Sequence, residues 1–345
     1  MLDYGKKDAA IMLGYAFILS ISIWSLMTYL LSPLRRFPGP FFADWTNLWR
    51  MLHVRRGNCH MVIQELHKKY GPVVRIGPNV LDFDIPELIN TIYNIKSDYL
   101  KVNGLPIPDF LDKFIEAKEK CPEVVDDMQV ISYLMINMIA GADTTGVTIN
   151  AALYFSLKHP HVWERLRTEI LAYDTSESTV ISYKSAKQFT YLNAVVRGAM
   201  RCHPAVAMLL ERYVPEDGLT LPNRSLVPAG SIVGINPYIV GRNKSVWGDD
   251  AEEFRPERWL RDEPRETEDA FQERLLSMNK ADLSFGGGSR SCIGEHLGLL
   301  EVYKVIATLV SRYDIKLAHP EKDWKTHNSF FVRQTGIEVK LTRRT

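Results

Sequence analysis

A glycine-rich segment near the C-terminal end of the chain carries the residue best suited to chemistry. Residues 285–294 read F-G-G-G-S-R-S-C-I-G and deliver Cys292 at the start of an apolar helical pattern that continues to Ile306. A helix N-terminus stabilises a thiolate through its dipole and its free backbone N–H groups, and glycines let the backbone approach a large flat cofactor. A sulfur in this position is a good axial ligand for haem iron. The alternative is an ordinary thiol buried in a glycine-rich loop.

A second group of candidate residues lies within a long apolar stretch. Residues 126–157 have helical spacing, and A-G-A-D-T-T stands among them at residues 140–145. Glycine in a helix costs about 1 kcal/mol relative to alanine, so Gly141 indicates that a ligand needs room against the backbone. The Thr144 hydroxyl and the Asp143 carboxylate can hold a water molecule and pass protons into a site. Alternatively, the hydroxyls of Thr144 and Thr145 only bond back to the preceding turn.

The elements that must position these residues are mostly helices. Besides the stretch at 126–157, apolar spacing predicts helices at residues 45–69, 86–93, 161–173, 184–202 and 293–306. A hairpin is predicted at residues 73–83, short strands at 209–214 and 231–235, and a solvated loop at the acidic stretch 262–273. The run at 131–140 is nearly all apolar and is predicted to be buried on most faces. The fold class is therefore mainly α with small β-sheets.

Composition and cysteine spacing restrict the function. The chain has 46% hydrophobic residues, 24% charged residues and a net charge of +1, so charge gives no argument for binding nucleic acid. Cys59, Cys121, Cys202 and Cys292 are widely scattered and show no C-x-x-C spacing. This pattern fits a reduced cytoplasmic compartment better than a disulfide framework or a zinc site.

The N-terminal residues predict a membrane anchor. Residues 9–31 are apolar, and the run is long enough to cross a bilayer as one helix. A cleavable signal peptide is the alternative, but the run is too long and ends in L-S-P-L-R-R-F-P-G-P instead of a small-residue cleavage site. More basic residues follow the run than precede it, which favours a cytoplasmic body. We expect residues 1–34 to form the anchor and residues 35–345 the catalytic domain.

Residues 285–294, which we call the cysteine loop, match F-x-x-G-x-R-x-C-x-G at every fixed position. In this the chain resembles the cytochrome P450 monooxygenases. The sequences Y-G-P-V-V-R-I-G-P-N and S-F-G-G-G-S-R-S-C-I-G-E-H-L-G-L-L-E resemble the fungal, pisatin-demethylase-like branch. The resemblance implies the cytochrome P450 fold and heme b, with Cys292 as the axial thiolate ligand of its iron. It also implies that Gly141 opens the oxygen pocket and that Thr144 and Asp143 deliver protons. The implied cofactor-binding residues are Phe285, Gly286, Gly288, Arg290, Cys292, Gly294 and Arg212, with both arginines on haem propionates.

The segment F-R-P-E-R-W at residues 254–259 matches the family segment that locks the cysteine loop to the core. Its key residue is Arg258, which in the family meets a glutamate and an arginine three residues apart on one helix. Arg201 is present here, but Gly198 takes the glutamate's place. Losing one partner of a buried charge network costs about 3 to 5 kcal/mol. Glu257 or a backbone carbonyl could satisfy Arg201 instead.

Two further segments stand where the family contacts its substrate. They are residues 205–210 and the turn of Ser329, Phe330 and Phe331, and core packing is the alternative for both. The family also carries a run of helices between the first sheet and the oxygen-binding helix. Here that connection is short, so we expect the fold to be incomplete near residues 103–107, with roughly a third of a usual family chain absent. An open haem face would admit water.

The expected function is that of a haem-thiolate monooxygenase that inserts one oxygen atom from O2 into an apolar small molecule, in fungal secondary metabolism. The resemblance implies electrons from an NADPH-cytochrome reductase and a single-pass anchor in the endoplasmic reticulum membrane, with the body in the cytoplasm. The alternative is a truncated, catalytically silent membrane-anchored haem-binding protein.

Overall fold

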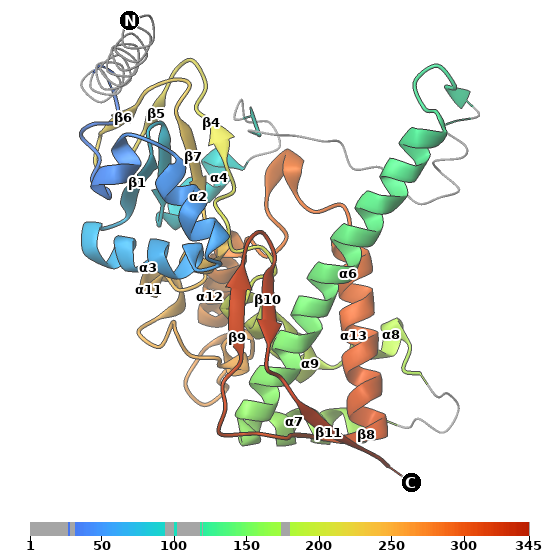
Figure 1. Ribbon diagram of the computed structural model, residues 1–345. Coiled ribbons are helices and arrows are strands. Elements are labelled where there is room, and N and C mark those ends of the chain that lie inside the picture. The colour runs from blue at the N-terminus through green and yellow to red at the C-terminus, as the bar shows by residue number, and fades with distance from the viewer. Residues whose placement is uncertain are drawn as a thin grey trace, which may run out of the picture.

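The computed structural model describes residues 32–93, 120–173 and 180–344, together with Met27, Leu100, Lys101 and Lys118. The anchor predicted at residues 9–31 lies outside the described residues except for Met27, and so does the expected junction at residues 103–107. The described chain forms a sheet-containing part and a helical part, which Figure 1 shows beside each other.

The largest sheet has five strands in the order β1-β2-β7-β4-β3. The predicted hairpin is confirmed, because β1 (Val73–Gly77) pairs antiparallel with β2 (Val80–Phe83). Strand β2 pairs in parallel with β7 (Ile232–Ile235), and β4 (Arg212–Tyr213) joins β7 to β3 (Leu100–Lys101). The other described strands form three two-stranded antiparallel sheets. These are β9 (Lys325–Asn328) with β10 (Val332–Thr335), β8 (Tyr313–Leu317) with β11 (Val339–Arg343), and β5 (Leu219–Thr220) with β6 (Leu226–Val227).

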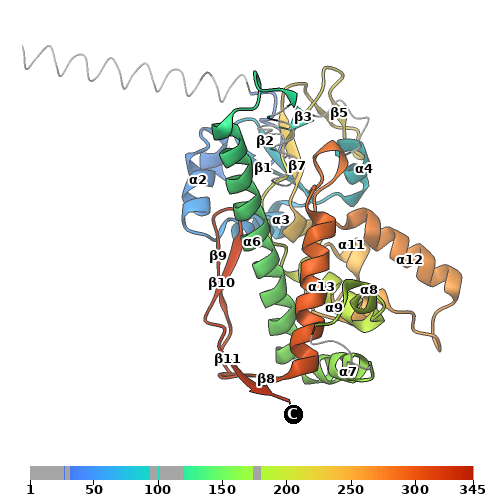
Figure 2. The same ribbon diagram turned by 90° about the vertical axis from the view of Figure 1, so that its right-hand side faces the viewer.

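Four helices form the main helical layer: α6 (Asp127–Lys158), α7 (Pro160–Leu171), α9 (Thr190–Cys202) and α13 (Glu295–Arg312). Helix α13 lies beside α6 in both views (Figures 1 and 2). The other described helices are α2 (Leu48–Arg55), α3 (Cys59–Tyr70), α4 (Ile89–Ile92), α8 (Tyr183–Ala186), α10 (Pro237–Val240), α11 (Lys244–Trp247) and α12 (Glu268–Ala281), with 3-10 turns η1 (Phe41–Asp44), η2 (Pro86–Leu88), η3 (Pro256–Trp259) and η4 (Gly288–Arg290).

Two large clusters of buried apolar side chains hold these parts together. The first packs the five-stranded sheet against α4 and α12 and includes Phe83 and Ile92. The second joins the four helices of the main layer through residues such as Leu166, Val195 and Ile306, all of which are fully buried. Since α13 belongs to the second cluster, its N-terminal end is fixed relative to α6.

Three predictions about local structure are wrong in part. The helix predicted at residues 45–69 is two helices, because Gly57 has a φ of 72° between α2 and α3, a conformation that only glycine adopts readily. The helix predicted at 184–202 is likewise interrupted between α8 and α9. The acidic stretch at 262–273 is only partly a loop, because α12 begins at Glu268, where the Thr267 hydroxyl accepts the Ala270 N–H.

The apolar run at residues 131–140 of α6 is exposed, which corrects the prediction that it is buried. Ile131, Met135, Met138 and Ile139 are all more than half exposed, with values from 52% to 69%. The packing helices cover α6 mainly from Val147 onward, where its buried residues concentrate. Within the described part of the chain, α6 is also the one helix long and apolar enough to cross a membrane.

A buried ion pair ties α3 to the five-stranded sheet. His67 Nε2 lies 3.3 Å from Asp82 Oδ1, and His67 Nδ1 lies 3.0 Å from the carbonyl oxygen of Gly71. Asp82 is completely buried. Burial by itself lowers the pKa of His67, but the hydrogen bond and charge of Asp82, with the Gly71 carbonyl, raise it overall. The pair is therefore strongest when His67 is protonated.

We predict that Asp82→Asn lowers the free energy of unfolding by about 3 kcal/mol, because it leaves a buried cation without its counter-ion. Since the folded-state pKa of His67 is raised, the contribution is complete below the unfolded pKa and is lost as pH rises through the folded pKa. Urea unfolding at about pH 6 and about pH 9 measures this. The exposed Glu87→Gln serves as control, and an equal loss for Asp82→Asn at both pH values would contradict the assignment.

Candidate functional site

The cysteine loop presents its sulfur to solvent. Cys292 is exposed, which excludes the alternative of a buried structural thiol. Its N–H donates to the Phe285 carbonyl oxygen at 2.8 Å, and this bond closes the loop. Protein atoms still crowd one side of the sulfur, so desolvation raises the pKa of the Cys292 thiol and outweighs the backbone N–H groups of Gly294 and Glu295, which lower it. The charge of Glu295 raises this pKa further, so the stabilisation of the thiolate that the sequence predicts at the helix start stays a prediction.

The glycines of this loop allow it to lie directly on Tyr93. Gly288 has a φ of 68°, and a Cβ added there would lie 2.0 Å from the Tyr93 carbonyl oxygen. A Cβ at Gly287 would lie 3.0 Å from the Cβ of Tyr93. Gly286 also has a positive φ, of 73°. The triple glycine is therefore required by close packing against Tyr93 as well as by the turn.

Tyr93 was missed by sequence reasoning, which placed it only at the end of a short helix. Its hydroxyl donates to the Leu210 carbonyl oxygen at 2.9 Å and accepts the Ile235 N–H at 2.7 Å. The Arg212 guanidinium lies 4.9 Å from the centre of its ring. Tyr93 thus connects the cysteine loop, strand β7 and the loop at residues 205–210.

Two arginines predicted to bind a cofactor lie near each other. Arg212 is buried, and Arg290 is exposed at the end of η4. Burial lowers the pKa of Arg212, and the charge of Arg290 lowers it further against an opposing effect of Tyr93. Among the described residues neither guanidinium has a carboxylate within 4.0 Å, and the one hydrogen bond from Arg212 goes to the Glu211 carbonyl oxygen. This arrangement suits a ligand that brings its own carboxylates.

Exposed apolar side chains border the place where α6 and α13 meet. A Cβ added to Gly298 of α13 would lie 3.8 Å from Thr145 Oγ1 of α6. N-terminal to that contact, apolar side chains are open to solvent, namely Met138 and Ile139 on α6, Ile293 two residues before α13, and Leu297 on α13. An exposed thiol, two cations that no described carboxylate neutralises, and these apolar side chains fit haem, which has a flat apolar ring, anionic propionates and an iron that accepts an axial sulfur.

The predicted proton-relay residues each have a partner already. The Thr144 hydroxyl donates to the Ala140 carbonyl oxygen at 2.6 Å, which is the back-bonded arrangement left open by the sequence. The Asp143 carboxylate accepts a hydrogen bond from Arg333 at 2.6 Å. Sequence reasoning missed Arg333, because it lies on β10, far along the chain. Around Gly141 the described residues leave open space.

The two segments predicted to contact substrate are adjacent in the fold. Val206 and Phe331 form an isolated antiparallel bridge, and the Val332 N–H donates to the Ala205 carbonyl oxygen at 3.0 Å. Phe330 is 58% exposed. Not all of the segment at 205–210 faces this contact, since Met208 and Leu209 line a cavity of about 280 Å³ against α2 and α3. Core packing accounts for Ala207, which is fully buried.

Arg201 finds its partners among backbone carbonyls. Its guanidinium donates to the carbonyl oxygens of Gly241, Ala251 and Glu253. The other alternative, Glu257, instead bonds the Tyr191 hydroxyl at 2.6 Å. Sequence reasoning had named a backbone carbonyl as one alternative, and the structure selects it.

The site and the mainly helical fold agree with what known proteins show. The sequence profile of the Cytochrome P450 family matches residues 84–341, and the chain belongs to this family. It is 33% identical to the cytochrome P450 monooxygenase cfoH of Aspergillus candidus, over 95% of this chain and 91% of that protein. It is 37% identical to vrtE of Penicillium aethiopicum, over 68% of this chain and 44% of that protein. It is 38% identical to cicH of Emericella nidulans, over 78% of this chain and 52% of that protein.

The comparisons also show that the chain is shorter than these relatives. The alignment with cfoH extends over 495 positions, which exceeds the 345 residues of this chain by 150. The matches to vrtE and cicH span about half the length of those proteins.

We predict that Gly288→Ala destabilises the fold by more than the cost of its positive φ alone, because the new Cβ would overlap the Tyr93 carbonyl oxygen. Gly230→Ala is the matched control, since Gly230 has a φ of 74° but open space around its Cβ position. We expect a loss of about 1 kcal/mol for Gly230→Ala and at least about 2 kcal/mol more for Gly288→Ala. Chemical denaturation measures both, and equal losses would refute the close packing on Tyr93.

Proposed function

We propose that this protein is a haem-thiolate monooxygenase that inserts one oxygen atom from O2 into an apolar small molecule. The observation that carries the proposal is the exposed Cys292 beside two arginines that no described carboxylate neutralises. Two like charges repel each other where no counter-ion lies between them, whereas a ligand with carboxylates compensates them. Membership of the cytochrome P450 family supports the same reading.

The proposed cofactor is heme b, which supplies the activation of dioxygen when it is bound. Cys292 would be its axial ligand, and the backbone N–H groups of Gly294 and Glu295 would stabilise the thiolate. Arg290 and Arg212 would neutralise the propionates. Phe285 holds Cys292 in the loop through its carbonyl oxygen, and Gly286 and Gly288 provide the turn that the loop needs.

Proton delivery is proposed for Thr144 and Asp143. The Asp143 carboxylate pairs with Arg333, and it becomes free to take up a proton and pass it on when that ion pair opens. Thr144 can exchange its bond to the Ala140 carbonyl oxygen for a water molecule by a rotation of its hydroxyl. Gly141 leaves the adjacent helix surface free of side-chain atoms, which gives a small ligand access to the backbone.

An apolar substrate would contact the loop at residues 205–210 and the turn at Phe330 and Phe331, which lie together. An NADPH-cytochrome reductase is the proposed electron donor, since the family generally uses such a partner. The fungal source of the similar monooxygenases favours a role in secondary metabolism.

We further propose that residues 1–34 anchor the catalytic domain at residues 35–345 to a membrane, and that helices present in longer relatives are absent near residues 103–107.

The cofactor assignment predicts a thiolate signature. Purified protein supplied with haem, reduced and exposed to carbon monoxide should show the red-shifted Soret band of thiolate ligation. Cys292→Ser should abolish the band, while Cys121→Ser, at the other exposed cysteine, should keep it. A band that survives in Cys292→Ser would show that another residue binds the iron.

Turnover distinguishes the proposed enzyme from the silent alternative, which neither the structure nor the comparisons support. The haem-loaded chain would be combined with a reductase, and NADPH consumption and product formation would be followed with apolar terpenoid and aromatic compounds. Coupled product formation supports the proposal. A normal thiolate band with no product from any compound would favour the silent protein.

The proposed anchor predicts that the domain at residues 35–345 lies on the cytoplasmic side of the membrane. In intact microsomes, added protease should digest the domain at residues 35–345, because the basic residues that follow the apolar run favour retention on the cytoplasmic side. Reversing the charge asymmetry, by removing Arg35 and Arg36 and adding basic residues before the run, should reduce digestion. Full protection of the unmodified domain would reverse the proposed topology.

A further inference from the structure

A short loop at residues 247–253 surrounds two buried guanidinium groups. Arg258 of η3, whose side chain is 4% exposed, donates to the carbonyl oxygens of Trp247 and Asp250. Arg201 of α9 donates to the carbonyl oxygens of Ala251 and Glu253 in the same loop. Burial lowers the pKa of Arg201 to about 10, and the charge of Arg258 contributes to this. The loop therefore has to stabilise two cations that repel each other away from water.

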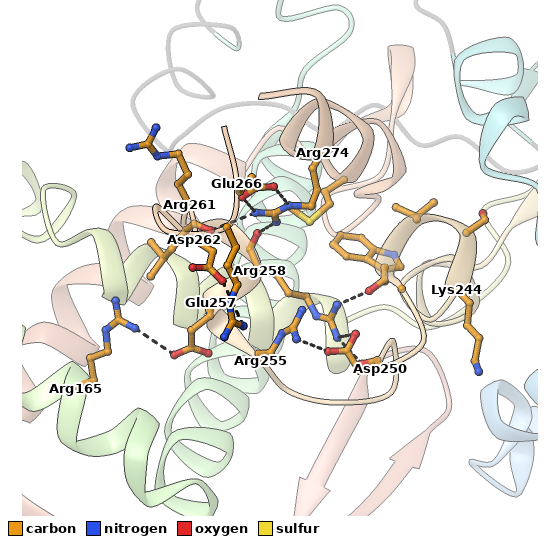
Figure 3. A pocket seen from close by; sticks show the side chains of 17 residues that line it. Arg165, Lys244, Asp250, Arg255, Glu257, Arg258, Arg261, Asp262, Glu266 and Arg274 are labelled. Carbon is orange, nitrogen blue, oxygen red and sulfur yellow. Dashed lines mark hydrogen bonds and ion pairs between the residues drawn. The ribbon is translucent and has the colours of Figure 1, made fainter. Parts of the chain in front are cut away.

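Among the described residues, Asp250 carries the one carboxylate that pairs with either of these arginines. Its Oδ1 lies 2.7 Å from Arg258 Nη2, and its Oδ2 lies 2.8 Å from Arg255 Nη1. Figure 3 shows the Asp250 carboxylate beside the guanidinium groups of Arg255 and Arg258, on the wall of a cavity of about 770 Å³. The neighbouring Asp249 is fully exposed, and its closest cation is Lys244 at 3.7 Å.

The position on α9 that could hold a carboxylate is filled by aromatic packing. A Cβ added to Gly198 would lie 3.0 Å from Phe254 Cε2 and 3.4 Å from Trp259 Cζ3. Both rings are buried and come from the segment that contains Arg258. A glutamate at this position would have to displace one of them. The negative charge for the two cations consequently comes from the loop instead of the helix.

Arg258 is linked in turn to the cysteine loop. Its carbonyl oxygen accepts a hydrogen bond from Arg274 of α12, which also pairs with Glu266 at 2.6 Å (Figure 3). Helix α12 ends at Ala281, and the cysteine loop begins four residues later at Phe285. A displacement of Arg258 would therefore reach the loop through one hydrogen bond and one helix.

We propose that Asp250 is a positioning residue that supplies the carboxylate missing at Gly198, and that it orients Arg258, α12 and thereby the Cys292 loop. The consequence for iron ligation rests on the proposed function, whereas the consequence for loop order does not.

The test compares Asp250→Asn with Asp249→Asn, two neighbouring carboxylates of which one is paired and the other is exposed. In the haem-free full chain, Asp250→Asn should lower the midpoint of thermal unfolding by about 5 °C, while Asp249→Asn should change it by less than about 1 °C. Hydrogen exchange of the Cys292 amide, which is bonded to the Phe285 carbonyl oxygen, should become at least about tenfold faster in Asp250→Asn alone.

The haem-loaded protein supplies a readout that a general loss of stability would not change. At a temperature where all variants are folded, the fraction of bound haem with the thiolate-type carbon monoxide band should fall at least about threefold in Asp250→Asn. Asp250→Glu should restore most of that fraction, because it keeps the carboxylate. If wild-type protein binds no haem, the proposed function fails, and amide exchange still decides the role of Asp250.

Two results would overturn the proposal. One is identical behaviour of Asp250→Asn and Asp249→Asn. The other is a lower unfolding midpoint for Asp250→Asn without faster exchange of the Cys292 amide, which would show a structural role only.

Discussion

Tyr93 lies where the cysteine loop, strand β7 and the loop at residues 205–210 meet, and the geometry of the site depends on this contact. The Tyr93 carbonyl oxygen occupies the space that a side chain at position 288 would need. Its hydroxyl bonds one strand and one loop, and its ring lies beside the Arg212 guanidinium. One buried aromatic residue thus fixes how the exposed sulfur is placed relative to the nearby cation.

Buried arginines impose a second constraint, because their charge must be met by oxygen atoms inside the protein. The structure meets this constraint in two ways. Arg201 is surrounded by backbone carbonyls, and Arg258 has carbonyls together with the Asp250 carboxylate. At Arg212 and Arg290 the described residues supply no carboxylate, although the two cations lie close together. This difference separates a structural cation network from one suited to an anionic ligand.

The N-terminal part of α6 exposes apolar side chains, and the chain is shorter than its relatives. Its apolar residues from Ile131 to Ile139 have the composition of a core helix, yet four of them are more than half exposed. The alignment with cfoH extends over 150 more positions than this chain has residues, so this relative contains additional chain. The side chains that surround the site are consequently more open to water than the apolar composition of the helix suggests.

The sequence by itself determined the elements and the chemistry that are local. The glycine-rich spacing around Cys292 placed this cysteine at the start of a helix, apolar periodicity predicted α6 and α13, and two short apolar runs separated by Gly-Pro-Asn predicted the β1–β2 hairpin. These features depend on neighbours in sequence, and so a motif is enough to recognise them. The sequence did not predict the exposure of side chains correctly where burial depends on distant elements, as at residues 131–140.

Only the tertiary structure decided which residues from distant segments meet. Asp143 pairs with Arg333 across 190 positions, Tyr93 supports a loop that begins almost two hundred residues later, and Arg201 is satisfied by carbonyls instead of Glu257. Such contacts arise because backbone carbonyls and buried rings are presented by the packing of whole elements, and a linear pattern contains no record of that packing. The same reason explains why Gly198 suggested only a missing partner in sequence, while in the fold it makes room for Phe254 and Trp259.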